Sequence, residues 1–339
     1  MSRSYLVFVL SVLASVTYAR PRSTSCREFV HNITASAVNR ASDGSAIPVN
    51  GTWPLSFRYC EPRIQRDALQ ILLHGASYDK TYWDFPSDLS PYSYVRFAAD
   101  RGYATLTYDR LGSGDSPHPD PIIVVQAPLQ IAIAEEVIAL ARSGHLLPDG
   151  RGYSRIIHVG HSFGSVITTG VLASSPSAID IAVLTGYAHH PVPAEIAATA
   201  MLTPARDVDP TRFGSLDPGY LTTLNSTTRA AVFYDSPGTF SPRILRRDEA
   251  TKGTFATGEL SHNVSSAPDF TGHVGAFIGE HDILNCDAGC TNVPNEPTFF
   301  PAATYEYTII PRSGHCLNLH YTAQLTFASV HRFLSQHGF

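Results

Sequence analysis

The sequence predicts an α/β fold, in which a mostly parallel sheet carries helices on both faces. Short apolar runs that suit buried strands alternate with segments whose apolar residues recur at helical spacing, as in 128–141. The chain has 339 residues, of which 43% are hydrophobic and 16% charged, so it is globular and long enough for a sizeable core. One long interval, 188–271, interrupts the alternation.

The expected strands and helices follow one another along the chain. Residues 20–52 are polar and rich in turn formers, and we expect an arm over the domain there, followed by an early antiparallel strand at 55–60. Further strands are predicted at 69–73, 104–108, 155–159, 181–184, 274–278 and 305–310. Helices are predicted at 92–100, 128–141, 162–173 and 317–334.

The interval 188–271 is too long for an ordinary connection between two strands, and it contains many Pro, Gly and Asp residues. We interpret it as a cap inserted into a catalytic domain that is formed by 20–187 and 272–339. An ordinary crossover helix with long flexible flanks is the alternative.

The first 19 residues have the pattern of a signal peptide. A basic start at Arg3 precedes an apolar run, and small residues at Thr17 and Ala19 suit a signal peptidase. The run is too short for a comfortable membrane span, although an uncleaved anchor is the alternative. No later segment is apolar enough to cross a membrane, so we expect a secreted protein without stable membrane insertion.

Cysteines and glycosylation triplets agree with secretion. In an oxidising compartment, Cys26–Cys60 and Cys286–Cys290 are plausible disulfides, although other pairings are possible, and Cys316 is left unpaired. Asparagines that precede x-Ser/Thr, and are therefore candidate glycosylation sites, are Asn32, Asn50, Asn225 and Asn263.

Charge and composition argue against several function classes. The net charge of −5 gives no reason to expect nucleic acid or an anionic membrane as partner. The chain has two lysines, Lys80 and Lys252, which disfavours Schiff-base chemistry. His189 and His190 have no partners at the spacing of a zinc site, so no metal is predicted. The stretch 109–116 lacks the Lys of a phosphate-binding loop, and we interpret it as a network of turns.

The strongest chemical motif is Gly160-His161-Ser162-Phe163-Gly164, which follows a predicted strand and opens a predicted helix. A nucleophile elbow requires this context, because a tight turn between strand and helix lifts the serine oxygen above the sheet. We therefore predict Ser162 as the nucleophile, with His161 packed beneath the turn.

A serine nucleophile needs a base and a carboxylate that orients the base. Asp282 and His315 each follow a predicted strand, so both loops emerge at the same edge of a parallel sheet as Ser162. We predict a triad of Ser162, Asp282 and His315. Glu280 is a rival for the acid. Cys316 is better explained as a small buried apolar group or a disulfide partner than as a nucleophile.

An oxyanion hole needs two donors. The N–H of Phe163 is the first. The N–H of Ala76, in the loop after strand 69–73, is our candidate for the second, and Ser77 is the next candidate. Substrate contacts are expected from this loop at His74 and Gly75. The aromatic residues that could line a pocket with the cap are Tyr187, Phe213, Tyr220, Phe233, Tyr234 and Phe240, although core packing is the simpler explanation for each of them.

With these motifs in hand, the chain resembles the α/β-hydrolase superfamily. The matching pieces, in the family's order, are His74-Gly75, the 109–116 stretch, the elbow, Gly279-x-x-Asp282 and Gly314-His315. The overall pattern also looks like that of secreted hydrolases of filamentous fungi. The resemblance implies an eight-stranded, mostly parallel sheet, the triad named above, a cap between the sixth and seventh strands, and no cofactor or metal.

Relatives in this superfamily narrow the chemistry. Epoxide hydrolases and haloalkane dehalogenases use Asp as nucleophile, whereas position 162 is Ser, and hydroxynitrile lyases add a Lys near the acid, which is absent here. We expect a serine hydrolase acting on a small apolar ester or lactone. The alternatives are a tailoring hydrolase of a fungal polyketide pathway, which opens or forms a ring, and a non-catalytic binding protein on the same fold.

Overall fold

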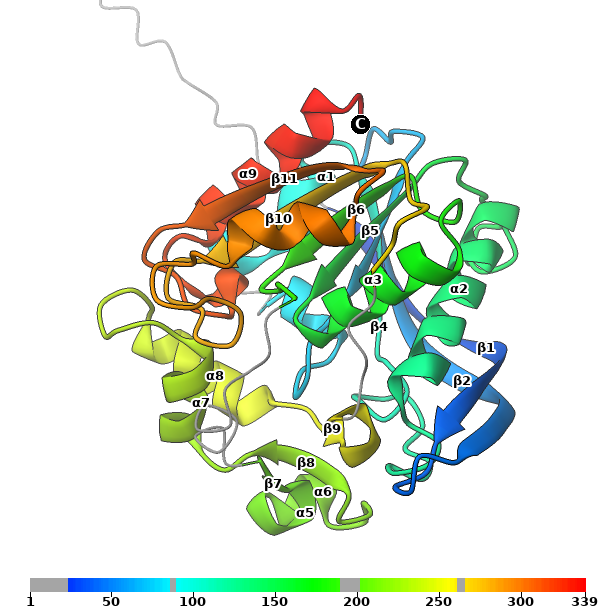
Figure 1. The fold of residues 1–339 in the computed structure, drawn as a ribbon, viewed down its shortest axis with the longest axis vertical. Coiled ribbons are helices and arrows are strands. Elements are labelled where there is room, and N and C mark those ends of the chain that lie inside the picture. Colours follow the sequence, from blue (N-terminus) through cyan, green and yellow to red (C-terminus); the bar gives the residue numbers. More distant parts are fainter. Residues whose placement is uncertain (1–23, 86–89, 190–201, 261–265) are drawn as a thin grey trace, which may run out of the picture.

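The computed structural model describes residues 24–85, 90–189, 202–260 and 266–339 (Figure 1). The predicted signal peptide at 1–19 and the triplet at Asn263 lie outside the described residues. Parts of the expected cap, 190–201 and 261–265, lie outside them as well.

Eight strands form the main sheet, in the order β1-β2-β4-β3-β5-β6-β10-β11. Their bounds are β1 Ser25–Arg40, β2 Ala46–Glu61, β3 Leu69–Leu73, β4 Ala104–Tyr108, β5 Ile156–His161, β6 Ile181–Thr185, β10 His273–Gly279 and β11 Thr304–Ile310. The pairs β1–β2 and β2–β4 are antiparallel, and all other neighbours are parallel. The predicted α/β-hydrolase fold with its eight-stranded, mostly parallel sheet is confirmed.

The expected polar arm at 20–52 is wrong for most of its length. Residues 25–40 form the edge strand β1, which pairs along its whole length with β2. Ile33 and Ala35 of β1 are buried, whereas their neighbours Asn32, Thr34 and Ser36 are exposed. An edge strand with one solvated face needs few apolar residues, so its sequence looks polar.

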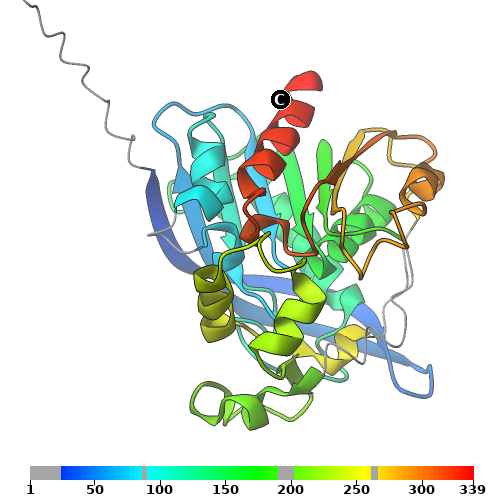
Figure 2. The ribbon, with the colours of Figure 1, turned by 90° about the vertical axis from the view of Figure 1, so that its left-hand side faces the viewer.

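Helices cover both faces of the sheet (Figures 1 and 2). One face carries α2 (Ala127–Ser143) and α3 (Phe163–Ser174), and the other carries α1 (Tyr94–Ala99) and α9 (Ala323–Gln336). Helix α2 has a proline in its first turn and ends at Gly144, whose φ of 78° suits glycine. The short 3-10 helices are η1 Lys80–Trp83, η2 Ser90–Tyr92, η3 Thr257–Leu260, η4 Val293–Phe299 and η5 Leu317–Leu319.

The predicted helix at 317–334 is interrupted. It consists of η5, a break at residues 320–322, and then α9. His320 accounts for the break, because its Nδ1 hydrogen-bonds the carbonyl oxygen of Cys316 and its Nε2 accepts from the N–H of Gly314. Burial lowers the pKa of His320 to about 4, so this ring stays neutral and ties the turn together.

Between β6 and β10, the described residues 202–260 contain a group of short elements, which we call the cap. A small antiparallel sheet has the order β7-β8-β9. The cap elements are β7 Leu202–Pro204, α5 Ala205–Val208, α6 Pro210–Phe213, β8 Tyr220–Thr223, α7 Ser226–Phe233, α8 Pro242–Thr251 and β9 Phe255–Ala256. They gather at one end of the main sheet, as the yellow-green segments of Figures 1 and 2 show. The cap contacts the loops after β3 and β11, since Gly253 N–H donates to Ser77 O and Cys316 N–H to Phe233 O.

Both predicted disulfides are present. Cys26 pairs with Cys60 across β1 and β2, and Cys286 pairs with Cys290 in the loop after β10. Cys316 is free and buried. Within the described ranges, no helix combines the length and the apolar character needed to cross a membrane. The side chains of Asn32, Asn50 and Asn225 are exposed.

Candidate active site

Ser162 stands between β5 and α3 in a strained turn. Its φ of 54° and ψ of −120° lie where residues with a side chain rarely occur, and its N–H donates to Thr185 O over 2.9 Å. A Cβ on Gly160 would lie 2.5 Å from Gly164 O, and one on Gly164 would collide with Leu73 O. The two glycines of the motif therefore allow the helix to start directly against the ends of β3 and β5.

Asp282 and His315 form a buried pair at the ends of β10 and β11. The Nδ1 atom of His315 lies 3.0 Å from Oδ2 and 3.1 Å from Oδ1 of Asp282, and their side chains are 2% and 0% exposed. A carboxylate accepts hydrogen bonds, so this network places the proton on Nδ1 and leaves a lone pair on Nε2.

In the structure, the predicted triad residues all lie at the carboxyl ends of strands, after β5, β10 and β11. The ring of His315 lies 4.9 Å from the ring of His161, which directly precedes Ser162. A Cβ on Gly186 would lie 3.0 Å from both the His161 ring and the carbonyl oxygen of His315, so this glycine allows the two loops to approach. Phe233 of the cap also stacks on His315, with the ring centroids 5.6 Å apart.

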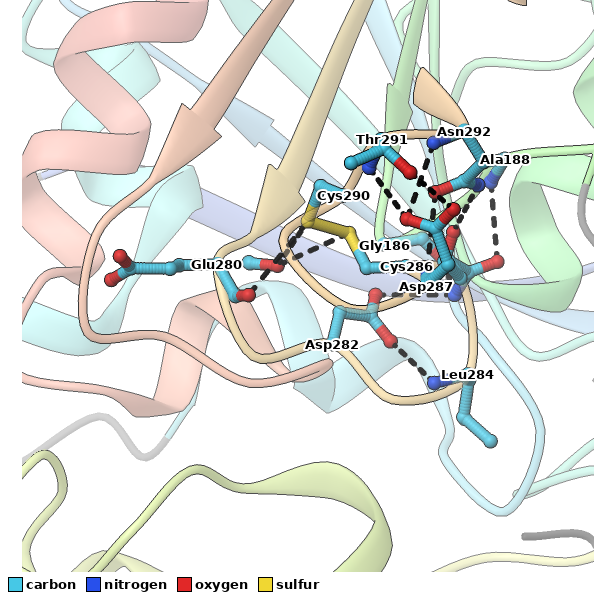
Figure 3. Close-up of a disulfide and its surroundings, with 12 residues drawn as sticks. Gly186, Ala188, Glu280, Asp282, Leu284, Cys286, Asp287, Cys290, Thr291 and Asn292 are labelled. Atoms are coloured by element: carbon cyan, nitrogen blue, oxygen red, sulfur yellow. Dashed lines mark hydrogen bonds between the residues drawn. A yellow bond between two sulfur atoms is a disulfide. The ribbon is translucent and has the colours of Figure 1, made fainter.

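The rival acid, Glu280, lies elsewhere. Its side chain is exposed and extends away from Asp282, as Figure 3 shows. One of its oxygens accepts the N–H of Arg312 over 2.9 Å. The carboxylate that meets His315 is therefore that of Asp282.

Asn285 was missed in the sequence and belongs to this site. Its Nδ2 donates to Asp282 Oδ2 over 3.1 Å and to Gly186 O over 2.9 Å, and lies 3.3 Å from Nδ1 of His315. Its Oδ1 accepts the N–H of Ala188. Its place three residues after the acid was the available signal, but one amide in a polar loop does not reveal such contacts.

The loop that carries Asp282 and Asn285 continues directly into a turn that the Cys286–Cys290 disulfide closes (Figure 3). The N–H of Cys286 donates to Asp282 O over 2.8 Å, and Nδ2 of Asn292 donates to Asn285 O over 2.8 Å. The disulfide and these bonds fold residues 282–292 into a compact turn that fixes the acid from its C-terminal side.

The two predicted oxyanion donors flank Ser162. A Cβ on Gly75 would lie 2.9 Å from Cβ of Ser162, so the loop after β3 passes directly over the serine. Ala76 and Ser162 are partly exposed, whereas Gly75, Ser77 and Phe163 beside them are buried. Phe163 is the first residue of α3, so its backbone N–H lies at the positive end of the helix dipole.

His74 and Tyr187, predicted to contact substrate, are buried. Nε2 of His74 accepts the N–H of Arg110 and its Nδ1 lies 2.8 Å from Gly75 O, so both ring nitrogens are engaged by backbone. Burial holds the pKa of His74 well below its usual value. Tyr187 is 6% exposed and packs in the core with its ring 5.1 Å from that of His189. The structure thus gives both residues a packing role.

His161 and Cys316 lie beneath the site. His161 is stacked on Tyr82 at 4.4 Å and its Nδ1 lies 3.2 Å from Oγ1 of Thr185, while burial holds its pKa well below the usual value. The Cys316 thiol lies 2.9 Å from the hydroxyl of Tyr78, and burial raises its pKa well above the usual value. A thiol that stays protonated is a poor nucleophile.

The aromatic residues proposed as pocket lining are all at least nine-tenths buried: Tyr187, Phe213, Tyr220, Phe233, Tyr234 and Phe240. Phe233 reaches the site by stacking on His315. Tyr220 and Tyr234 instead direct their hydroxyls to Pro119 O and to Asp248. For most of this set, packing of the cap explains the position.

The 109–116 stretch is a network of turns, as interpreted from the sequence. Asp109 accepts from the backbone N–H and the ammonium of Lys80 and from the N–H of Asp115, and Ser116 donates to Asp109 O. Among residues that the structure describes, no cluster of three or more His, Cys, Asp or Glu side chains could hold a metal ion.

The chain matches a known protein family by sequence and several solved structures by fold. Residues 70–326 match the model of the alpha/beta hydrolase family. Similar structures include an esterase from Thermogutta terrifontis (14% identity, 90% of this chain and 99% of that chain, TM-score 0.60). A bromoperoxidase from Bacillus anthracis is also similar (15% identity, 90% of this chain and 100% of that chain, TM-score 0.58). So is an epoxide hydrolase from Vigna radiata (14% identity, 91% of this chain and 98% of that chain, TM-score 0.55). By sequence, no curated protein matches significantly.

Proposed function

The chain belongs to the alpha/beta hydrolase family, and on this premise we propose that it is a secreted serine hydrolase that cleaves a small apolar ester or lactone. The observation that carries the proposal is the strained turn at Ser162 between β5 and α3, with a φ of 54°, and the buried Asp282–His315 pair supports it. The family includes several chemistries, and Ser in place of Asp at this turn favours acyl transfer.

In the proposed reaction, Nε2 of His315 accepts the hydroxyl proton of Ser162 while Oγ attacks the substrate carbonyl carbon. The N–H groups of Phe163 and Ala76 donate to the oxygen that becomes negative. His315 then gives the proton to the departing alkoxide, and the acyl group stays on Ser162. Water that gives its proton to His315 then attacks this ester, and His315 returns the proton to Oγ of Ser162 as the acyl–oxygen bond breaks and the acid leaves.

Asp282 has two tasks in this scheme. It holds His315 in the tautomer with the proton on Nδ1, and its negative charge stabilises the imidazolium that forms on each proton transfer. The pair is almost inaccessible to water, with side chains 2% and 0% exposed, so this interaction is weakly screened. Asn285 supplies the carboxylate with a further donor at 3.1 Å.

Labelling with a fluorophosphonate tests the assignment of the nucleophile. We expect the wild type and Ser154→Ala, which changes a surface serine, to take one label per chain, and Ser162→Ala to take none. Esters of increasing acyl length and lactones of increasing ring size would then define the substrate. An unlabelled wild type, or equal labelling of Ser162→Ala, would overturn the proposed function.

Secretion is supported by the predicted leader at 1–19, by two disulfides, and by exposed triplets at Asn32, Asn50 and Asn225. The test is expression of the full chain in a eukaryotic host. We expect the protein in the medium, without the leader and with a mass that falls on treatment with peptide N-glycosidase. Retention in the cells at the unmodified mass would contradict this part of the proposal.

A further inference from the structure

The loop that carries the Ala76 N–H has an uncommon backbone conformation. Ser77, the next residue, has a φ of 57°, in the left-handed region that residues with a side chain seldom adopt. Such a conformation persists where surrounding contacts impose it. One contact is the hydrogen bond of 2.9 Å from Gly253 N–H, in the cap, to Ser77 O.

The other contacts on Ser77 come from Arg229 of α7. Its Nη1 donates to Ser77 Oγ over 3.1 Å, and its Nη2 lies 3.4 Å from Ser77 O. The guanidinium also donates to both carboxylate oxygens of Asp248 in α8, from Nε over 2.7 Å and from Nη2 over 2.9 Å. The side chains of the ion pair are 0% and 1% exposed.

The ion pair is also connected to the histidine side of the site. Asp248 accepts from the hydroxyl of Tyr234 over 2.8 Å and from that of Tyr78 over 3.3 Å. The Tyr78 hydroxyl in turn lies 2.9 Å from the thiol of Cys316, which directly follows His315. The guanidinium lies over the rings of Tyr78 and Phe233, at 4.4 and 5.1 Å. The cap therefore touches both loops that flank Ser162.

A buried ion pair is a costly way to stabilise a fold. The desolvation of two charges often exceeds their attraction, and apolar residues of similar size frequently serve stability as well. What apolar residues cannot replace is a fixed set of donors in a planar geometry. Arg229 aims such donors at the carbonyl and hydroxyl oxygens of Ser77, one residue from the proposed oxyanion donor.

We propose that the Arg229–Asp248 pair of the cap positions the loop of residues 75–77, so that the Ala76 N–H points at the oxyanion formed on Ser162. This inference rests on the proposed function. Neither side chain is assigned a contact with substrate, so both are positioning residues. The cap then contributes to the catalytic rate through its contacts with this loop.

The main variant combines Arg229→Met with Asp248→Leu, which removes both charges and leaves no buried ion unpaired. We expect kcat per labelled site to fall about tenfold or more, since loss of a whole oxyanion donor costs about 10²–10³. A trifluoromethyl ketone, which forms an oxyanion when Ser162 adds to it, should lose affinity by a similar factor. The KM should change by less than about threefold, because the substrate ground state does not use this hole fully.

Two further variants keep the test decisive if the double variant folds poorly. Ser77→Ala removes the hydroxyl that Arg229 contacts, and it should lower kcat by a smaller factor in the same direction. Arg229→Lys keeps the charge but loses the planar donor set, and it should retain more activity than the double variant.

The matched control is Arg142→Met with Asp180→Asn, which removes an ion pair of 2.7 Å. This pair lies where β5 and β6 begin, away from the site at their carboxyl ends. The control variant should leave kcat per labelled site unchanged. If the cap variants keep the wild-type kcat and ketone affinity, or if only KM rises, the positioning role is wrong while the proposed function stands. A wild type that takes no fluorophosphonate label overturns both.

Discussion

The side-chain amide of Asn285 donates to Oδ2 of Asp282 across 3.1 Å, and its oxygen accepts the N–H of Ala188. The second contact fixes which end of the amide faces the carboxylate. Asn285 therefore presents a hydrogen to a charge that the proposed mechanism needs, and it also joins the acid loop to the loop after β6.

The two tasks of Asn285 can be separated by substitution. Asn285→Asp keeps the shape and the acceptor for Ala188, but it replaces the donor by a second carboxylate beside Asp282. Asn285→Ala removes both contacts. We expect kcat to fall about tenfold in the Ala variant, as for a lost hydrogen bond to a charged group, and further in the Asp variant because like charges repel. Steady-state kinetics at pH 7.5 measures this order; an Asp variant more active than the Ala variant would show a purely structural role.

The Cys286–Cys290 disulfide closes the turn that directly follows Asp282 and Asn285. Replacing both cysteines by Ser should let this turn relax, and we expect kcat to fall about tenfold, because a shift of about 1 Å in a catalytic group can cost about 10². The wild type should lose activity in dithiothreitol by the same factor, while the variant should not respond further.

The other disulfide provides the control for this change. Cys26 and Cys60 join β1 and β2, at the opposite edge of the sheet from β10 and β11. Their replacement by Ser should lower the melting temperature and leave kcat unchanged. Equal kcat in both double variants would show that the acid loop keeps its shape without its disulfide.

Gly75 tests the close approach of the oxyanion loop to the nucleophile. In Gly75→Ala the new Cβ would lie 2.9 Å from Cβ of Ser162, so the serine or the loop must move. We expect kcat/KM to fall by about 10² or more. Gly150→Ala is the matched control, because Gly150 has open space around it and a φ of 70°. It should cost stability and leave kcat/KM unchanged, and a wild-type rate in Gly75→Ala would contradict the geometry.

How much of the fold could be predicted depended on burial. The bounds of β3 and β4 were predicted from sequence, because every residue of both strands is buried and, apart from Gln70, all of them are apolar or β-branched. The edge strand β1 was not, because most of its side chains face solvent. The turn at His320 was hidden within a helical pattern, since a side-chain hydrogen bond to the backbone leaves no periodic signal.

In the candidate site, some residues have a local sequence signal and others do not. Ser162, Asp282 and His315 could be placed because each follows a strand in a recognisable local pattern. Arg229 could not, since its partner Ser77 is 152 positions away in the chain. Asn285 is adjacent to the acid, yet its function depends on backbone groups of Gly186 and Ala188, 99 and 97 positions away. Such contacts follow from the fold and not from any local motif.

The last prediction concerns stability at low pH. His331 of α9 is packed among the rings of Tyr94, Phe97 and Tyr103, at 5.1 to 5.5 Å, and neither ring nitrogen has a hydrogen-bond partner in the described part of the chain. Burial lowers its pKa to about 3, against about 6.5 in an unfolded chain. Below pH 6.5 the unfolded chain therefore binds a proton that the folded protein excludes, and stability falls as the pH decreases.

His331→Phe removes this proton uptake and suits an aromatic environment. We compare the free energy of unfolding of the variant with that of the wild type. Between pH 8 and pH 5, we expect this difference to shift in favour of the variant by about 2 kcal/mol. Urea unfolding at the two pH values measures the change. His145→Gln, which alters an exposed histidine, should give the same difference from the wild type at both pH values. A pH-independent effect of His331→Phe would mean that the ring at this position is already protonated, or hydrated, in the folded protein.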